Sequence, residues 1–131
     1  MQPARTGEVE KVPVVSIVDD DESVRAATQC LVRSLGYAAR TFASAEEFLA
    51  SDIVSETKCL ILDIAMPGMS GPELQQELVR RRQEIPIVFI TAQSDETIRP
   101  RVIAGGAVEC LFKPFSEAAL IDALNSALRM R

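Results

Sequence analysis

The sequence has few cysteines, no excess of basic residues and no long hydrophobic segment. No apolar run approaches the ~18 residues that a membrane-spanning helix needs, so we expect no contact with a membrane. The first 11 residues, MQPARTGEVEK, lack the apolar core of a signal peptide, and we expect residues 1–11 to form a disordered tail. These absences favour a single cytoplasmic domain over residues 12–131.

The three cysteines do not indicate a covalent framework. Cys30, Cys59 and Cys110 share no CxxC spacing, and each lies alone in an apolar segment. This arrangement argues against both a disulfide framework and a zinc site. We therefore predict three buried free thiols in a reducing compartment.

The charge balance argues against direct contact with nucleic acid. The net charge is −5, from 14 basic and 19 acidic residues, and no stripe of Lys and Arg occurs along the chain. Binding to a phosphate backbone depends on such basic surfaces. We expect any DNA binding in this biology to belong to another domain.

What the sequence does contain is an alternation of two kinds of segment. Five apolar runs have the length of β-strands, and they cover residues 14–18, 38–42, 59–62, 87–90 and 107–112. The segments between them carry apolar residues at helical spacing. Near-continuous apolar strands joined by helices predict an α/β fold with a doubly wound, flavodoxin-like parallel sheet and helices on both faces.

Short signals mark the ends of the predicted helices. Gly36 closes the first helix, and Ser44 with Glu47 has the spacing of a capping box at the start of the second. Gly71 stands where the third helix can begin, and Ser116 precedes the last. These signals support the alternation of strands and helices.

Polar residues stand where four of these strands end. Asp19 and Asp20 follow the first strand, Asp63 the third, Thr91 the fourth and Lys113 the fifth. In an open parallel sheet the carboxyl ends of all strands meet at one edge, where ligands bind. We therefore expect these five side chains to form one site.

This combination of side chains suits phosphoryl transfer. Carboxylates held close together repel one another unless a cation neutralises them, and Mg²⁺ prefers one or two carboxylates with phosphate oxygens and water. A hydroxyl and an ammonium group opposite the acids suit the remaining phosphoryl oxygens. Because an aspartate can accept the group as an acyl phosphate, we predict that Asp63 is the acceptor.

Four short motifs at these strand ends resemble one known family. VDDDE, LDIAMPGMSG, ITA and FKPF resemble, in this order, the receiver domain of bacterial two-component response regulators, and the spacing is most similar to the FixJ and NarL (LuxR-type) group. The resemblance implies a CheY-like fold with strand order 2-1-3-4-5. It also implies that a sensor histidine kinase or a phosphotransfer protein phosphorylates Asp63.

The resemblance assigns the metal ligands. It implies that Asp20 binds Mg²⁺ directly and that Asp19 binds it through water. Asp63 and the backbone carbonyl of Ala65 would complete the protein ligands. The site would then be magnesium-dependent.

Further residues have roles by the same resemblance. Thr91 and Lys113 would hold phosphoryl oxygens, and the peptide bond from Lys113 to Pro114 would be cis. Ala65 and Gln93 occupy positions that tune the lifetime of the phosphoryl group in the family. The chain would be a signalling domain that catalyses only its own phosphorylation and slow autodephosphorylation.

The group also implies partners and an output. A homodimer would form through helix 4, strand 5 and helix 5. A DNA-binding effector domain downstream of this domain would make transcription regulation the output. No nucleic acid would be bound by the receiver domain itself.

Three alternatives compete with this interpretation. A haloacid-dehalogenase-type phosphatase also uses a strand-end Asp with Mg²⁺, Thr and Lys, but it needs a second Asp at the position of Ala65. A flavodoxin-like FMN binder needs a phosphate-binding loop where this chain has DDDE, and acids there would repel the cofactor. The third is a degenerate receiver that acts only as a protein-interaction module.

Two residues depart from the family near its output surface. Cys110 stands where receivers carry a Tyr or Phe that turns inward, and its side chain is too small to replace that ring. Pro100 falls within the expected fourth helix, so we predict a shortened helix that begins near Pro100, or a distortion before it. Phe112 lies on the same strand face as Cys110, which makes it a candidate substitute for that ring, with a buried core residue as the alternative interpretation. We expect phosphorylation to act by ordering residues 94–106.

Overall fold

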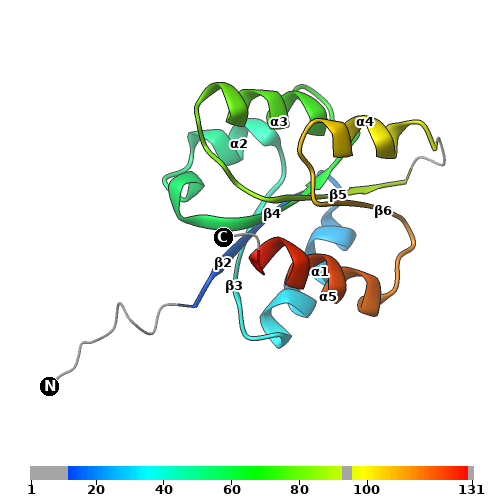
Figure 1. Ribbon diagram of the computed structural model, residues 1–131. Helices are drawn as coiled ribbons and strands as arrows, with labels where there is room; N and C mark the ends of the chain where they lie inside the picture. Colours follow the sequence, from blue (N-terminus) through cyan, green and yellow to red (C-terminus); the bar gives the residue numbers. More distant parts are fainter. Residues whose placement is uncertain (1–11, 93–95, 130–131) are drawn as a thin grey trace, which may run out of the picture.

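A parallel sheet of five strands runs through the centre of the structure, with helices on both of its faces (Figure 1). The computed structural model describes residues 12–92 and 96–129. The strands are β2 (Val14–Val18), β3 (Ala38–Phe42), β4 (Thr57–Asp63), β5 (Ile87–Thr91) and β6 (Glu109–Phe112). Their order across the sheet is β3-β2-β4-β5-β6, and all neighbouring pairs are parallel. Counted along the chain, this is the predicted order 2-1-3-4-5, which is confirmed.

Helices form a layer on each side of the sheet (Figure 1). The helices on one face are α1 (Glu22–Ser34) and α5 (Glu117–Arg129). Those on the other face are α2 (Ala45–Ala50), α3 (Gly71–Arg80) and α4 (Ile98–Ala104). A short 3-10 helix, η2 (Val54–Glu56), leads into β4. The three-layer α/β arrangement is the one that the sequence predicts.

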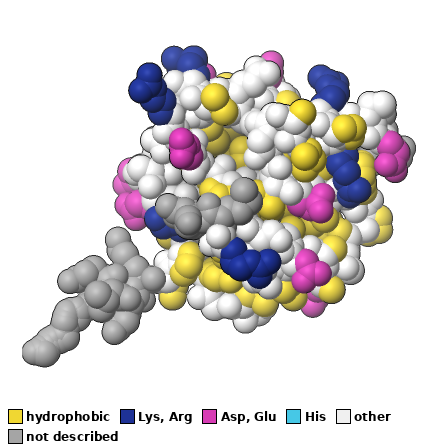
Figure 2. Space-filling view, viewed as in Figure 1, with side chains coloured by type: hydrophobic (Ala, Val, Ile, Leu, Met, Phe, Trp, Pro, Cys, Tyr) yellow, Lys and Arg dark blue, Asp and Glu magenta, His cyan; other side chains and the backbone are white. Residues whose placement is uncertain are grey.

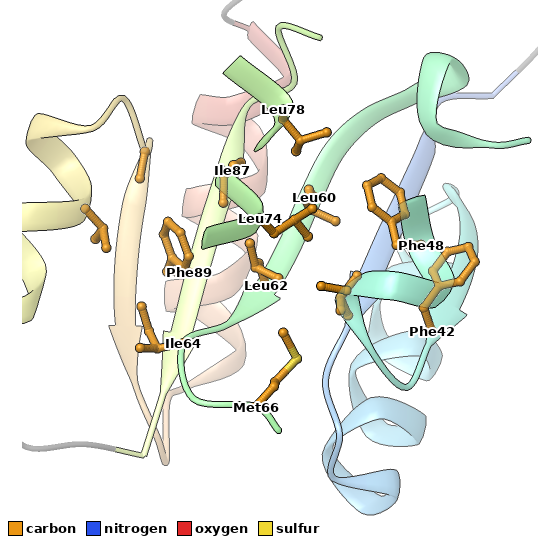
Figure 3. Packing of buried hydrophobic residues seen from close by; sticks show 14 of the residues in the cluster. Phe42, Phe48, Leu60, Leu62, Ile64, Met66, Leu74, Leu78, Ile87 and Phe89 are labelled. Atoms are coloured by element: carbon orange, nitrogen blue, oxygen red, sulfur yellow. The ribbon is translucent and has the colours of Figure 1, made fainter. Parts of the chain in front are cut away.

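Each face of the sheet has its own hydrophobic cluster. Alternation along β4 sends Leu60 and Leu62 to the α2–α3–α4 side and Cys59 and Ile61 to the α1–α5 side. All four are fully buried, and complete burial of a leucine or isoleucine side chain stabilises a fold by ~1.5–3 kcal/mol. Figure 3 shows the first cluster, in which labelled residues from β4 and α3 point toward one another. The sheet is therefore packed between two hydrophobic clusters, one on each face.

Local capping fixes where the helices begin. Ser70 and Glu73 form a complete capping box at the start of α3. At α2 the Ser44 hydroxyl accepts from the Glu47 N–H at 3.1 Å, as predicted, but the Glu47 carboxylate accepts from the N–H of Ala43, one residue before the cap. The capping prediction for α2 is therefore correct for the hydroxyl only.

The cysteine prediction is wrong for one of the three residues. Cys59 and Cys110 are buried and free, but Cys30 is exposed on α1. Thr28 and Val32 are the buried residues of that helix, and Cys30 is two positions from each. Two positions correspond to ~200° around a helix, so Cys30 faces away from the sheet.

The bounds of three elements differ from the predicted ones or sharpen them. β4 begins two residues earlier than the apolar run. Thr57 is buried, pairs with Val14 of β2, and its hydroxyl forms a hydrogen bond with the Ser16 hydroxyl at 2.7 Å. β6 begins at Glu109, because Ala107 still belongs to the turn that closes α4. α4 is short and begins at Ile98, so Pro100 lies in its first turn, where an N–H has no intrahelical partner. The shortened fourth helix is confirmed.

The charged surface shown in Figure 2 and the lengths of the helices bear on possible contacts with nucleic acid and membranes. Figure 2 shows basic and acidic side chains interspersed on the face that it displays. Within residues 12–92 and 96–129, no helix is both long and apolar enough to cross a membrane. The predicted tail, residues 1–11, lies outside the described residues.

Candidate functional site

The polar strand-end residues lie at one edge of the sheet. Asp19 directly follows β2, Asp63 ends β4, Thr91 ends β5 and Lys113 directly follows β6. Because all neighbouring strands are parallel, these carboxyl ends share an edge. The predicted convergence of the side chains is therefore present in the fold.

Three carboxylates form a compact cluster. Asp19, Asp20 and Asp63 each present an oxygen atom, and the three oxygens lie within 4.8 Å of one another. Asp19 is fully buried and Asp63 is only 5% exposed, whereas Asp20 is open to solvent. A hard divalent cation that retains several water ligands fits such a donor set, because the exposed side leaves room for water.

The side chain of Lys113 lies beside two of these carboxylates. Its Nζ is 3.3 Å from Asp19 Oδ2 and 3.9 Å from Asp63 Oδ1. The lysine side chain is 18% exposed, so its charge acts through a partly buried environment. One ammonium group lies beside two of the three carboxylates, so negative charge remains for a cation to neutralise.

Asp63 has a raised pKa in this cluster. Burial and, after it, the charge of Asp19 raise the pKa of Asp63 from its ordinary value of 3.8 to about 7, although Lys113 acts in the opposite direction. Hydrogen bonds with Asp19 and Asp20 also raise this pKa. A bound cation would favour the ionised, nucleophilic form of the carboxyl group.

The acidic run that follows β2 divides into two functions. Asp21 is the N-cap of α1, and its carboxylate accepts hydrogen bonds from the N–H groups of Ser23 and Val24. Asp19 is instead fixed toward the site, because its Oδ1 accepts from the Asp21 N–H at 2.9 Å. A single stretch of sequence therefore supplies both the start of a helix and two carboxylates of the cluster.

Backbone hydrogen bonds hold the opposite side of the site. The Lys113 N–H donates to the Thr91 carbonyl at 2.7 Å, and the Ile64 N–H donates to the Ile90 carbonyl at 3.0 Å. Thr91 is fully buried. The peptide bond between Lys113 and Pro114 is cis, which confirms that prediction.

The loop after Asp63 depends on tertiary contacts that no local sequence pattern indicates. The Cβ of any larger residue at Gly71 would lie 2.3 Å from the backbone oxygen of Asp63, so only glycine fits there. The Glu46 carboxylate accepts from the Met69 N–H at 2.9 Å, while Gly68 has a φ of +76°. The spacing of Ser70 and Glu73 could have indicated the capping box that follows; no local pattern indicates the Glu46 contact or the close approach of Gly71.

Two predicted site positions stand apart from this geometry. Ala65 is exposed in the loop after Asp63, and the role of its carbonyl as a metal ligand stays a prediction. Gln93 lies outside the described residues. The structure thus brings together Asp19, Asp20, Asp63 and Lys113 by measured distances and places Thr91 at the same edge.

Comparison with known proteins gives consistent results. Residues 15–125 match the response regulator receiver domain family. The chain is 43% identical over 114 residues to nodulation protein W of Bradyrhizobium diazoefficiens, which covers 87% of this chain and 50% of that protein. It is 34% identical over 119 residues to the transcriptional regulatory protein FixJ of Azorhizobium caulinodans, which covers 91% of this chain and 56% of that protein.

A solved structure is also similar. The response regulator StyR superposes with a TM-score of 0.84 at 47% sequence identity, over 91% of this chain and 60% of that one. This chain therefore spans about half the length of the curated relatives described above.

Proposed function

This chain belongs to the response regulator receiver domain family, and we propose that Asp63 is its phosphoryl acceptor. Membership makes it a signalling domain of two-component systems. The proposal concerns the residues that carry the chemistry: Asp63 as nucleophile, with Thr91 and Lys113 as ligands of the phosphoryl oxygens. The donor is a sensor histidine kinase or a phosphotransfer protein.

Phosphoryl transfer to Asp63 forms one bond to phosphorus and breaks another. An ionised oxygen of Asp63 attacks the phosphorus atom, a P–O bond forms, and the P–N bond to the donor histidine breaks. The electron pair of that bond stays on the imidazole nitrogen, which takes up a proton, so the donor histidine is left as a neutral imidazole. Lys113, whose Nζ lies 3.9 Å from Asp63 Oδ1, would bind an oxygen of the transferred phosphoryl group. Slow autodephosphorylation returns the carboxylate when water attacks the same phosphorus atom.

The metal ligands follow from the donor set. Asp19, Asp20, Asp63 and the carbonyl of Ala65 would hold Mg²⁺, which supplies neutralisation of charge on the carboxylate and phosphoryl oxygens. Asp20, the exposed member, would bind the ion directly, and buried Asp19 would bind it through water, as the family resemblance implies. The raised pKa of Asp63 supports this assignment, because a cation favours the ionised form that must attack.

The observation that carries the proposal is the juxtaposition of three carboxylates within 4.8 Å with an ammonium group 3.9 Å from Asp63. A degenerate receiver has no use for this arrangement, because a buried carboxylate cluster costs stability when nothing binds it. The phosphatase alternative requires an acid at position 65, where the chain has alanine.

The test is phosphorylation in vitro. Incubation with Mg²⁺ and acetyl phosphate or phosphoramidate should add one phosphoryl group, seen by intact mass spectrometry and removed by hydroxylamine, which cleaves acyl phosphates. Asp63→Ala should take up none, whereas Asp52→Ala, at an exposed carboxylate on another part of the surface, should match the natural sequence. Equal uptake by Asp63→Ala would contradict the assignment.

The remaining features of the proposal concern the whole protein. This chain covers about half of its curated relatives, and one of them is named a transcriptional regulatory protein. We infer a DNA-binding effector domain as the output and a cytoplasmic setting. We also infer a homodimer through α4, β6 and α5, which are the fourth α-helix, fifth strand and fifth α-helix along the chain.

A further inference from the structure

The outer edge of β6 carries a side-chain arrangement in place of a neighbouring strand. β6 is the last strand of the sheet, so one side of it has no strand partner. The Cys110 N–H donates to Glu109 Oε1 at 2.9 Å. The Cys110 carbonyl accepts two hydrogen bonds from Arg99, a residue of α4. Both backbone groups of Cys110 are thus satisfied by side chains.

Arg99 makes three kinds of contact with this strand. Its Nε and Nη2 donate to the Cys110 carbonyl at 3.1 and 2.7 Å. Its guanidinium carbon lies 5.1 Å from the centre of the Phe112 ring, and its Nε lies 3.8 Å from Glu109 Oε1. A planar guanidinium group suits this combination, because it can donate in its plane while its face rests on a ring. We call these contacts the Arg99 clamp.

Among the described residues, the apolar contact of α4 with the rest of the domain is small, and it comes from buried Val102 and partly buried Ile98. Of its seven residues, all of which the structure describes, only Val102 is buried. The Gln75 side chain donates to the Val102 carbonyl at 3.3 Å, and two glycines follow the helix. A helix with so small a buried surface opens readily unless specific contacts hold it. Among the contacts described for residues 98–104, the Arg99 clamp is the most extensive polar one.

The clamp lies next to the phosphorylation site along the chain. Phe112, under the guanidinium group, precedes Lys113, and it pairs in register with Thr91. Lys113 contacts the carboxylates of the site, so the residue that senses the phosphoryl group and the residue that supports Arg99 are neighbours. A phosphoryl group that immobilises Lys113 would also fix the end of β6 and the ring of Phe112.

We propose that the Arg99 clamp couples the phosphorylation site to α4: a phosphoryl group at Asp63 fixes the end of β6, the clamp tightens on it, and α4 becomes more ordered. This inference rests on the proposed function of Asp63. It assigns a positioning role to Arg99, which does not touch the phosphoryl group.

Amide hydrogen exchange of peptides from residues 96–106 tests the clamp, with and without beryllofluoride and Mg²⁺. Fluorine NMR on the same samples reports separately whether beryllofluoride is bound. In the natural sequence we expect slower exchange of α4 when beryllofluoride is bound. Arg99→Ala should raise exchange of α4 in the free protein by roughly tenfold, because charged hydrogen bonds to a backbone carbonyl are lost. The same variant should bind beryllofluoride and show less than about a third of the normal slowing.

Two further variants make the test specific. Arg101→Ala removes the same charge from an exposed position of α4 and should keep the normal response. Arg99→Lys keeps the charge with a single ammonium group, so it should give an intermediate response. If Arg99→Ala binds beryllofluoride and slows like the natural sequence, or if α4 of the natural sequence does not respond to bound beryllofluoride, the clamp proposal is wrong. Absence of any beryllofluoride binding would instead contradict the proposed role of Asp63.

Discussion

The raised pKa of Asp63 predicts that replacing this residue with asparagine stabilises the metal-free protein at alkaline pH. Burial beside Asp19 raises the pKa from 3.8 to about 7, so the folded state binds a proton more tightly than the unfolded state does. Stability from this group is therefore fully present below about pH 4 and is lost as the pH rises through 7. Asparagine is neutral throughout and escapes the loss.

The magnitude follows from the shift. A pKa displaced from 3.8 to about 7 corresponds to ~4 kcal/mol between the two protonation states. Because Asp20 is exposed and water can relax around the ionised site, we expect about half, ~2 kcal/mol, as the stabilisation by Asp63→Asn at pH 8. For a domain of this size, ~2 kcal/mol raises the Tm by roughly 6–10 °C.

The assay is chemical and thermal unfolding of both proteins from pH 5 to pH 8 in the presence of a chelator. The advantage of Asp63→Asn should shrink to under ~1 kcal/mol at pH 5, where the natural carboxyl group is protonated in the folded state. Adding Mg²⁺ at pH 8 should stabilise the natural protein more than the variant and so narrow the gap. Asp52→Asn, at an exposed carboxylate, serves as the control.

One pattern of results would refute this reasoning. The reasoning is wrong if Asp63→Asn is no more stable than the natural protein at pH 8, or if its advantage grows as the pH falls. Either result would mean that ionisation of Asp63 does not destabilise the folded state. Lys113, 3.9 Å away, would then offset both burial and the charge of Asp19. The pH dependence distinguishes a destabilising carboxylate from a favourable ion pair with Lys113. If the ion pair dominates, the difference in unfolding free energy between variant and natural protein changes with pH in the opposite direction.

Two further predictions concern neighbours of Asp63. Asp20→Asn should abolish most of the Mg²⁺-induced rise in Tm while leaving metal-free stability level or higher, since it deletes a ligand and relieves repulsion; an undiminished rise would exclude the ligand role. Gly71→Ala should destabilise the fold by ~2–3 kcal/mol in urea melts, because its Cβ meets the Asp63 carbonyl at 2.3 Å. Gly105→Ala, which meets only the flexible end of Gln75, should cost less, and equal losses would contradict the steric argument.

The sheet and the edge that carries the site were predictable because their signals are local. Each strand is an apolar run, and each site residue stands at the end of one, so parallel topology alone brings Asp63 and Lys113 to the same edge. The sequence placed Asp19 at the site, but it did not indicate that Asp21, two residues later, is the N-cap of α1. Which acid caps α1 and which turns into the cluster depends on the direction of the chain as it leaves β2, and both positions are aspartate.

The errors have a similar origin. Cys30 was predicted to be buried from its apolar neighbours, but the face of α1 that meets the sheet is set by Thr28 and Val32. The requirement for glycine at position 71 arises from a close approach between the start of α3 and the backbone of Asp63. Contacts of this kind join residues across a tertiary interface, and no spacing within a short segment encodes them.

Position 110 illustrates how sequence and structure complement each other. The sequence predicts that Cys110 cannot act as an aromatic switch, and it offers Phe112 on the same strand face as a candidate substitute. In the structure, Arg99 bonds to the carbonyl of residue 110, and every residue placed there has a carbonyl. The contact is therefore independent of the side chain at 110 and depends on the arginine. Arg99 therefore holds α4 against β6 although residue 110 of this chain has no ring.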